Sequence, residues 1–123
     1  MAKILIVDDS NLSRRILRTI LVAEAYEIIE APDGLVGIET YVMEQPDLVL
    51  LDLAMPGMPG DEVLEKILEL DPAARVIVAT ADLQDLTKTK VLASGARGFV
   101  NKPFNRTKVL SAVNQVLNSI PKI

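Results

Sequence analysis

The fold class is decided by residues 47–57, Asp-Leu-Val-Leu-Leu-Asp-Leu-Ala-Met-Pro-Gly. The apolar run before Asp52 is typical of a strand that is buried on both faces, as in a parallel sheet. Pro56 and Gly57 end the extended segment soon afterwards. Asp52 is therefore predicted at the carboxyl end of a buried strand, where open α/β sheets bind their ligands. An aspartate there can also be an ordinary turn residue, so its role depends on the rest of the chain.

Strand and helix patterns alternate along the rest of the chain. Short apolar runs predict strands at residues 4–7, 26–31, 47–52, 75–80 and 98–101. Amphipathic segments predict helices after residues 10 and 34, from residue 59, over 84–94 and from about 105. The connections are too short for antiparallel detours, so we expect a (βα)5 fold of class α/β, a doubly wound five-stranded parallel sheet with helices on both faces and right-handed crossovers. The expected strand order is the flavodoxin-like 2-1-3-4-5.

Apolar positions at helical spacing predict the buried face of each helix. The segment 84–94 gives the weakest prediction, because residues 87–90 are polar on every side. The apolar positions, helix by helix, are Leu12, Ile16, Leu17, Ile20 and Leu21; Leu35, Ile38, Tyr41 and Val42; Val63, Leu64, Ile67 and Leu68; Leu86, Val91 and Leu92; and Val109, Val113, Val116, Leu117 and Ile120.

Composition limits the possible functions. The 123 residues, 50% of them apolar, suit one globular domain over residues 1–123. A net charge of -4 and only two tyrosines and two phenylalanines argue against direct nucleic-acid binding. The first apolar run is too short for a signal sequence or a membrane span, so we expect a soluble, cytoplasmic protein. The chain has no cysteine and no histidine, which leaves a hard, oxygen-ligated cation such as Mg²⁺ as the metal that its side chains suit.

Polar residues follow the strands of the predicted sheet. Asp8 and Asp9, Asp52, Thr80 and Lys102 end the first, third, fourth and fifth strands. Because parallel strands end at one edge of a sheet, these side chains should converge. Clustered carboxylates repel one another unless a cation binds between them, and an aspartate can accept a phosphoryl group as a nucleophile. This chemistry makes Asp52 the candidate nucleophile, Asp8 and Asp9 the candidate metal ligands, and Thr80 and Lys102 the candidate phosphate ligands.

Four motifs carry a resemblance to a known family. They are Ile-Leu-Ile-Val-Asp-Asp-Ser at 4–10, Leu-Leu-Asp-Leu-Ala-Met-Pro-Gly at 50–57, Ala-Thr-Ala at 79–81 and Phe-Val-Asn-Lys-Pro-Phe at 99–104. Each motif alone is weak, but all four occur in order. Over residues 3–117 the chain resembles the receiver domain of two-component response regulators, and its size is close to that of the single-domain chemotaxis type.

The resemblance implies a role for each residue at the strand ends. Asp52 would take a phosphoryl group from a histidine kinase or a histidine phosphotransfer protein, which agrees with the absence of histidine here. Asp9, Asp52 and the backbone carbonyl of Ala54 would bind Mg²⁺, with Asp8 acting through water. Lys102 would contact the phosphoryl group, and Pro103 would follow a cis peptide bond.

The resemblance also implies a switch. Thr80 and Phe99 match the family's switch pair, through which phosphorylation changes the surface near the fourth helix, fifth strand and fifth helix and so controls binding of a downstream protein. Considered alone, Thr80 could be a strand residue and Phe99 a core aromatic. Two further positions, Ala54 and Asp82, tune the phosphoryl lifetime in the family. Their opposing effects lead us to hypothesise a moderately long-lived phosphoryl group.

Several alternatives remain at this point. The chain could instead be a Mg²⁺-dependent phosphohydrolase that works through an aspartyl phosphate, but Ala54 occupies the position where such an enzyme needs a second carboxylate. A flavodoxin-like cofactor binder would need a phosphate-binding loop, which the sequence lacks. Monomer and phosphorylation-dependent dimer are both compatible with the sequence. Arg14, Arg15 and Arg18 form either a solvated helix face or a docking surface for an acidic kinase.

Overall fold

The structure, a computed structural model, describes residues 2–82 and 84–118 and confirms the predicted α/β fold. The five strands are parallel and lie in the order β2-β1-β3-β4-β5. Their bounds agree with the predicted ones to within a residue or so, and no helix of these ranges is long and apolar enough to cross a bilayer. The strands are β1 (Lys3–Val7), β2 (Glu27–Ala31), β3 (Leu48–Leu51), β4 (Val76–Thr80) and β5 (Gly98–Asn101).

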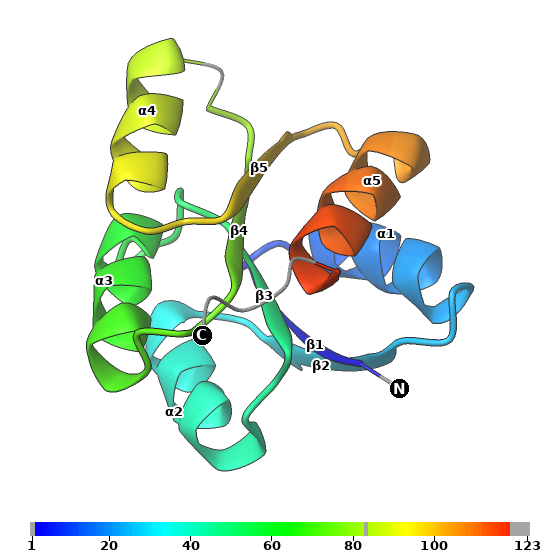
Figure 1. The fold of residues 1–123 in the computed structure, drawn as a ribbon, viewed down its shortest axis with the longest axis horizontal. Coiled ribbons are helices and arrows are strands. Elements are labelled where there is room, and N and C mark those ends of the chain that lie inside the picture. Colours follow the sequence, from blue (N-terminus) through cyan, green and yellow to red (C-terminus); the bar gives the residue numbers. More distant parts are fainter. Residues whose placement is uncertain (1, 83, 119–123) are drawn as a thin grey trace.

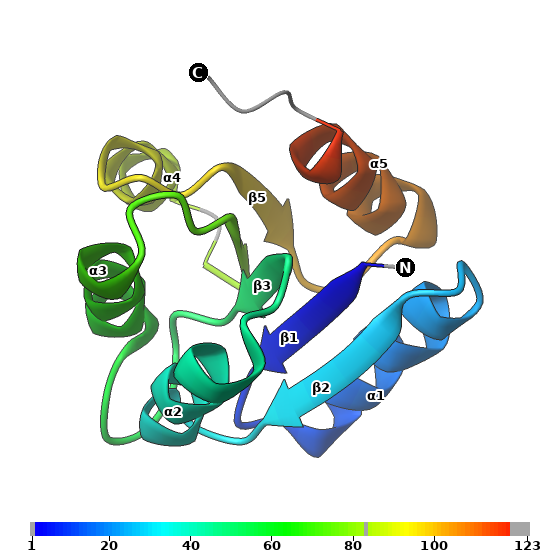
Figure 2. The same ribbon diagram turned by 60° about the horizontal axis from the view of Figure 1, so that its bottom comes forward.

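Helices cover both faces of the sheet, as the views in Figures 1 and 2 show. On one face lie α1 (Asn11–Val22) and α5 (Arg106–Leu117), and on the other α2 (Gly34–Glu44), α3 (Gly60–Leu70) and α4 (Asp85–Ala93). Alternate residues of β1 feed the two cores. Ile4 and Ile6 pack toward α1 and α5, whereas Leu5 and Val7 pack toward α2 and α3. This two-sided burial explains why β1, β3 and β4 are nearly continuous apolar runs.

The predicted buried faces of three helices need correction. Leu12 and Ile16 of α1 are 65% and 37% exposed, so only the other three positions of that stripe are buried. Leu35 and Val42 of α2 and Leu86 and Leu92 of α4 are also exposed. Val91 alone is buried in α4, which agrees with the weak pattern there. Ile120 lies outside the described residues.

Glycines explain the error in α2. Its buried residues are Gly34, Gly37 and Tyr41. A Cβ atom on Gly37 would lie 2.9 Å from the Val7 side chain, so the helix can approach β1 closely only without one. A pattern based on apolar side chains does not detect such a contact.

Candidate functional site

The predicted site residues converge at the carboxyl edge of the sheet. Backbone bonds of the sheet continue past the strand ends and fix two of them, because Asp52 N donates to Val7 O (3.0 Å) and Lys102 N donates to Thr80 O (2.9 Å). A hollow of about 410 Å³ lies beside them. Its lining residues are Asp9, Asp52, Leu53, Ala54, Thr80, Ala81, Asp82 and Lys102.

Two carboxylates of the site are buried and share one cation. Asp8 and Asp52 are 1% and 4% exposed. Lys102 Nζ lies 3.0 Å from Asp8 Oδ2 and 3.1 Å from Asp52 Oδ2. Burial alone would lower the pKa of Lys102, but the close contacts with Asp8 and Asp52 and their negative charges outweigh burial and raise that pKa. The ammonium group is therefore the resident counter-ion of both acids.

The Asp8 carboxylate is only partly satisfied. Its Oδ1 accepts a hydrogen bond from Ser10 N (2.9 Å), whereas the buried Oδ2 accepts none of ordinary geometry, although the Lys102 ammonium lies close to it. Burial is the largest cause that raises the pKa of Asp8; the Ser10 and Lys102 contacts lower it, and the charge of Asp52 raises it further. A buried acceptor of this kind is costly to leave without a donor or a cation.

The site suits a divalent cation. Asp8, Asp9 and Asp52 each offer a carboxylate oxygen, and these oxygens lie within 4.8 Å of one another. Three carboxylates and one ammonium group leave two negative charges to be balanced. Oxygen donors of this type suit Mg²⁺, and the buried Oδ2 of Asp8, which accepts no hydrogen bond of ordinary geometry, supports the same conclusion.

Thr80 connects the site to α4. Its buried hydroxyl oxygen accepts a bond from Asp82 N at 3.3 Å. The Asp82 carboxylate in turn accepts from Gln84 N and from Thr87 Oγ1, both at 2.9 Å. Asp82 lines the hollow beside Asp52, and these bonds tie its carboxylate to the amino end of α4.

The segment after β4 also meets β5. Asn101 Nδ2 lies 3.5 Å from Asp82 O, at the limit of a hydrogen bond. Phe99 is half-buried, pairs in register with Val78 and packs against the core on the face of the sheet that α2, α3 and α4 cover. The Lys102–Pro103 peptide bond is cis.

Two residues of the site were not identified from the sequence. Gly60 begins α3 directly behind Asp52, and a Cβ there would lie 2.0 Å from Asp52 O. Only glycine allows this approach, and the Pro59-Gly60 pair at the predicted helix start was the available signal. Phe104 places its ring centroid 6.0 Å from Lys102 Nζ, within reach of a weak cation–π contact.

The three arginines of α1 do not form one surface. Arg15 is exposed, but the Arg14 side chain is only 13% exposed and binds Glu30, Asn11 and the backbone of Asp8. Arg18 also pairs with Glu30, at 2.8 Å. A uniformly solvated face is therefore the wrong interpretation for Arg14.

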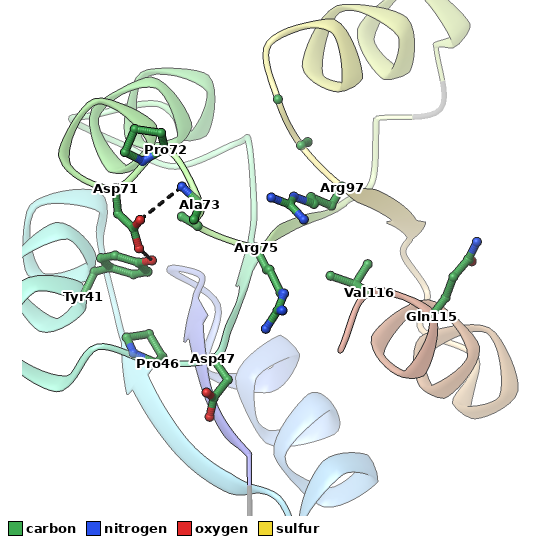
Figure 3. Close-up of a pocket in the computed structure, with 13 residues that line it drawn as sticks. Tyr41, Pro46, Asp47, Asp71, Pro72, Ala73, Arg75, Arg97, Gln115 and Val116 are labelled. Carbon is green, nitrogen blue, oxygen red and sulfur yellow. Dashed lines mark hydrogen bonds between the residues drawn. The ribbon is translucent and has the colours of Figure 1, made fainter. Parts of the chain in front are cut away.

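A larger hollow of about 1020 Å³ lies at the opposite, amino edge of the sheet (Figure 3). Arg75 and Arg97 point toward it, and Tyr41 lies at its side. Its acids are already bonded, since Asp71 accepts from Tyr41 OH (2.7 Å) and Ala73 N (3.1 Å), and Asp47 accepts from Lys3 N (2.7 Å). The larger hollow thus has no acid comparable to Asp8.

Known proteins resemble this chain along most of its length. The family model of the response regulator receiver domain matches residues 4–114. The chain is 38% identical over 117 residues to the chemotaxis protein CheY of Bacillus subtilis, covering 94% of this chain and 98% of that protein. It is 42% identical over 118 residues to Protein CcdB of the same bacterium, covering 95% and 98%.

A solved structure gives the same result. The fold matches a chain of the CheX-CheY-BeF3-Mg+2 complex from Borrelia burgdorferi with a TM-score of 0.92 and 36% sequence identity. The match covers 96% of this chain and 90% of that one.

Proposed function

Because the chain belongs to the response regulator receiver domain family, we propose that it is a phosphorylation-controlled signalling module whose phosphoryl acceptor is Asp52. One observation carries this proposal. Asp52 is a buried carboxylate that lies in an open hollow with a lysine ammonium 3.1 Å from one of its oxygens. The donor would be a histidine kinase or a histidine phosphotransfer protein, because the chain itself has no histidine.

In the proposed reaction, Asp52 acts as the nucleophile. A carboxylate oxygen attacks the phosphorus of the donor phosphohistidine, so that an O–P bond forms as the P–N bond breaks. The electron pair leaves with the imidazole, which takes up a proton from solvent. Lys102 would neutralise charge on the phosphoryl oxygens, and the Thr80 hydroxyl would donate a hydrogen bond to one of them.

Mg²⁺ is the proposed cofactor. The side chains of Asp9 and Asp52 and the backbone carbonyl of Ala54 would hold it, with Asp8 acting through water. When bound, the ion would supply positive charge to the phosphoryl oxygens. Asp9 and Ala54 are exposed at the rim of the hollow, which supports access for an ion and for a donor protein.

The proposed output is a change of surface near α4, β5 and α5. If Thr80 turns toward the phosphoryl group, its hydroxyl leaves Asp82 N, and the segment that anchors α4 can shift. Phe99, which is half-buried on the same face of the sheet as α4, would follow as the second part of the switch. We propose that the new surface binds a downstream protein, that residues 1–123 act as one domain in the cytoplasm, and that the chain is a monomer or a phosphorylation-dependent dimer.

Two measurements test the proposal. Acetyl phosphate should add one phosphoryl group in the presence of Mg²⁺ and none in EDTA, as mass spectrometry of the intact protein would show. Beryllofluoride-treated protein should capture a partner that the Asp52→Asn variant, treated in the same way, does not. Identical partner lists, or labelling that ignores Mg²⁺, would reject the switch.

The phosphohydrolase alternative has less support. Ala54, two residues after Asp52, has no acid–base group. Among the described residues, only Asp8 and Asp9 join Asp52 in the acidic cluster. Steady turnover of a small phosphate ester would reverse the order of the two hypotheses.

A further inference from the structure

We infer that Arg14 is a positioning residue of the acidic site, which holds the Asp8–Asp9 peptide so that both carboxylates face one cation. This inference rests on the proposed function, because it concerns the same Mg²⁺ site. Arg14 touches neither the hollow nor a carboxylate of the cluster. It acts through the backbone between them.

The contacts of Arg14 fix the segment that follows β1. One terminal nitrogen of its guanidinium donates to the backbone carbonyl of Asp8, and the other donates to Asn11 Oδ1. On the opposite side, Asp8 N donates to Ala31 O of β2 at 3.2 Å. The backbone groups of Asp8 are thus bonded on both sides, by α1 and by β2. The side-chain direction of Asp9, the next residue, depends on the same peptide.

A second acid orients the arginine. Glu30 of β2 accepts from Arg14 Nε at 3.2 Å and from Arg18 Nη1 at 2.8 Å. With these bonds, both terminal nitrogens and Nε of Arg14 have partners, and the side chain is 13% exposed. A planar guanidinium can satisfy three acceptors in fixed directions, which a lysine ammonium on a flexible stem cannot do with the same geometry.

The charge of Arg14 gives a sharp test. A positive charge next to an acidic cluster opposes cation binding, so a purely electrostatic role predicts that its removal tightens Mg²⁺ binding. A positioning role predicts the opposite, because outer residues that orient metal ligands typically contribute roughly 10–100-fold to metal affinity. The two roles therefore differ in the sign of the effect.

The experiment is a Mg²⁺ titration of the whole chain, followed by the NMR amide signals of Asp9 and Asp52, which report on folded molecules only. We expect Arg14→Gln to weaken Mg²⁺ binding about tenfold. Arg14→Lys should weaken it nearly as much although the charge is kept. Glu30→Gln, which loosens Arg14 without changing it, should have a smaller effect in the same direction. Arg15→Gln is the matched control, since it removes a charge from the next, exposed position, and it should leave the affinity within twofold or tighten it.

Unchanged or tighter Mg²⁺ binding in both Arg14 variants would overturn the inference while leaving the proposed function intact. If the wild-type protein itself binds no Mg²⁺, the proposed function fails along with the inference. A urea unfolding curve for each variant identifies any that does not fold, and Glu30→Gln then decides the question with Arg14 in place.

Discussion

Strand β3 is flanked by two aspartates whose surroundings differ completely. Asp47, before the strand, is exposed and accepts a hydrogen bond from Lys3 N at 2.7 Å. Asp52, after it, is buried, lies 3.1 Å from the Lys102 ammonium and belongs to the acidic cluster. The aspartate before the strand is thus a surface group, whereas the aspartate after it is the proposed nucleophile.

Chain direction explains the difference. Helices of a βαβ fold run antiparallel to the strands, so their amino ends, which favour negative charge, lie at the carboxyl edge of the sheet. The amino edge receives the helix carboxyl ends, where cations are favoured, and there Arg75 and Arg97 point toward the larger hollow (Figure 3). The proposed site therefore lies where buried negative charge is incompletely neutralised, and not in the larger of the two hollows.

The largest expected effect separates the two aspartates directly. Asp52→Asn should abolish phosphorylation by acetyl phosphate, because the amide oxygen is a far poorer nucleophile than a carboxylate. Asp47→Asn should leave the labelling rate within twofold. Mass spectrometry of both variants checks this, and a comparable loss in Asp47→Asn would contradict the assignment of the site to the carboxyl edge.

The second-largest effect is expected when a basic side chain at each edge of the sheet is replaced by glutamine. Lys102→Gln leaves Asp8 and Asp52 without their counter-ion, so we expect a loss of about 2 kcal/mol in the free energy of unfolding, which added Mg²⁺ partly restores. Arg75→Gln should change stability by less than about 0.5 kcal/mol, since Arg75 makes no ion pair within the described part of the chain. Urea unfolding with and without Mg²⁺ measures both values. If both variants lost the same free energy of unfolding, the two edges of the sheet would not differ in the way described.

Replacement of Asp8 should have a smaller effect on stability, and one opposite in sign to that of Lys102→Gln. Burial raises the pKa of Asp8 in the folded state, so the folded protein binds this proton more tightly than the unfolded chain does. Stability is therefore lost as the pH rises through the raised pKa. Asp8→Asn should be more stable than the wild type by about 1 kcal/mol at pH 7 without Mg²⁺.

The stability gap between Asp8→Asn and the wild type should close as the pH falls toward 3.8, the ordinary pKa of the carboxyl group. Asp71→Asn at the amino edge is the control. Its carboxylate is hydrogen-bonded, so the substitution should destabilise the protein. Unfolding curves at several pH values decide, and a gap that widens on acidification would refute the explanation.

The smallest expected effect concerns the amino edge alone. Tyr41→Phe removes the bond from Tyr41 OH to Asp71, which should reduce stability by about 0.5–1 kcal/mol. Labelling of Asp52 should be unaffected. A changed labelling rate in this variant would show that the two edges are coupled.

Much of the site could be predicted because parallel strands end at a common edge. Apolar runs fixed the strands, and Asp8, Asp52, Thr80 and Lys102 then had to meet. The contact distances could not be predicted in this way. Whether one lysine contacts two acids depends on the conformation of its side chain. Hydrophobic periodicity does not predict that conformation.

Other features of the structure that the sequence patterns did not predict also have physical causes. Helical periodicity places a charged residue such as Arg14 on the outer face, although its long side chain returns to the backbone of Asp8. The direction of the Asp82 carboxylate depends on two donors at the amino end of α4, Gln84 N and Thr87 Oγ1, whose positions in space do not follow from the order of the residues. The close contacts of Gly37 and Gly60 could not be predicted from the pattern of apolar side chains, because glycine has no side chain.

The anchoring of α4 has a consequence for signalling noise. Val91 is the single buried residue of this helix, and two hydrogen bonds to the Asp82 carboxylate hold its amino end. Bonds of this kind contribute about 1 kcal/mol each, so alternative positions of α4 would lie only a few kcal/mol above the resting one and would be sampled by a minor fraction of molecules. A partner that binds such a position of α4 selectively could bind the unphosphorylated protein. The strength of the two hydrogen bonds would then determine how much of this binding occurs without phosphorylation.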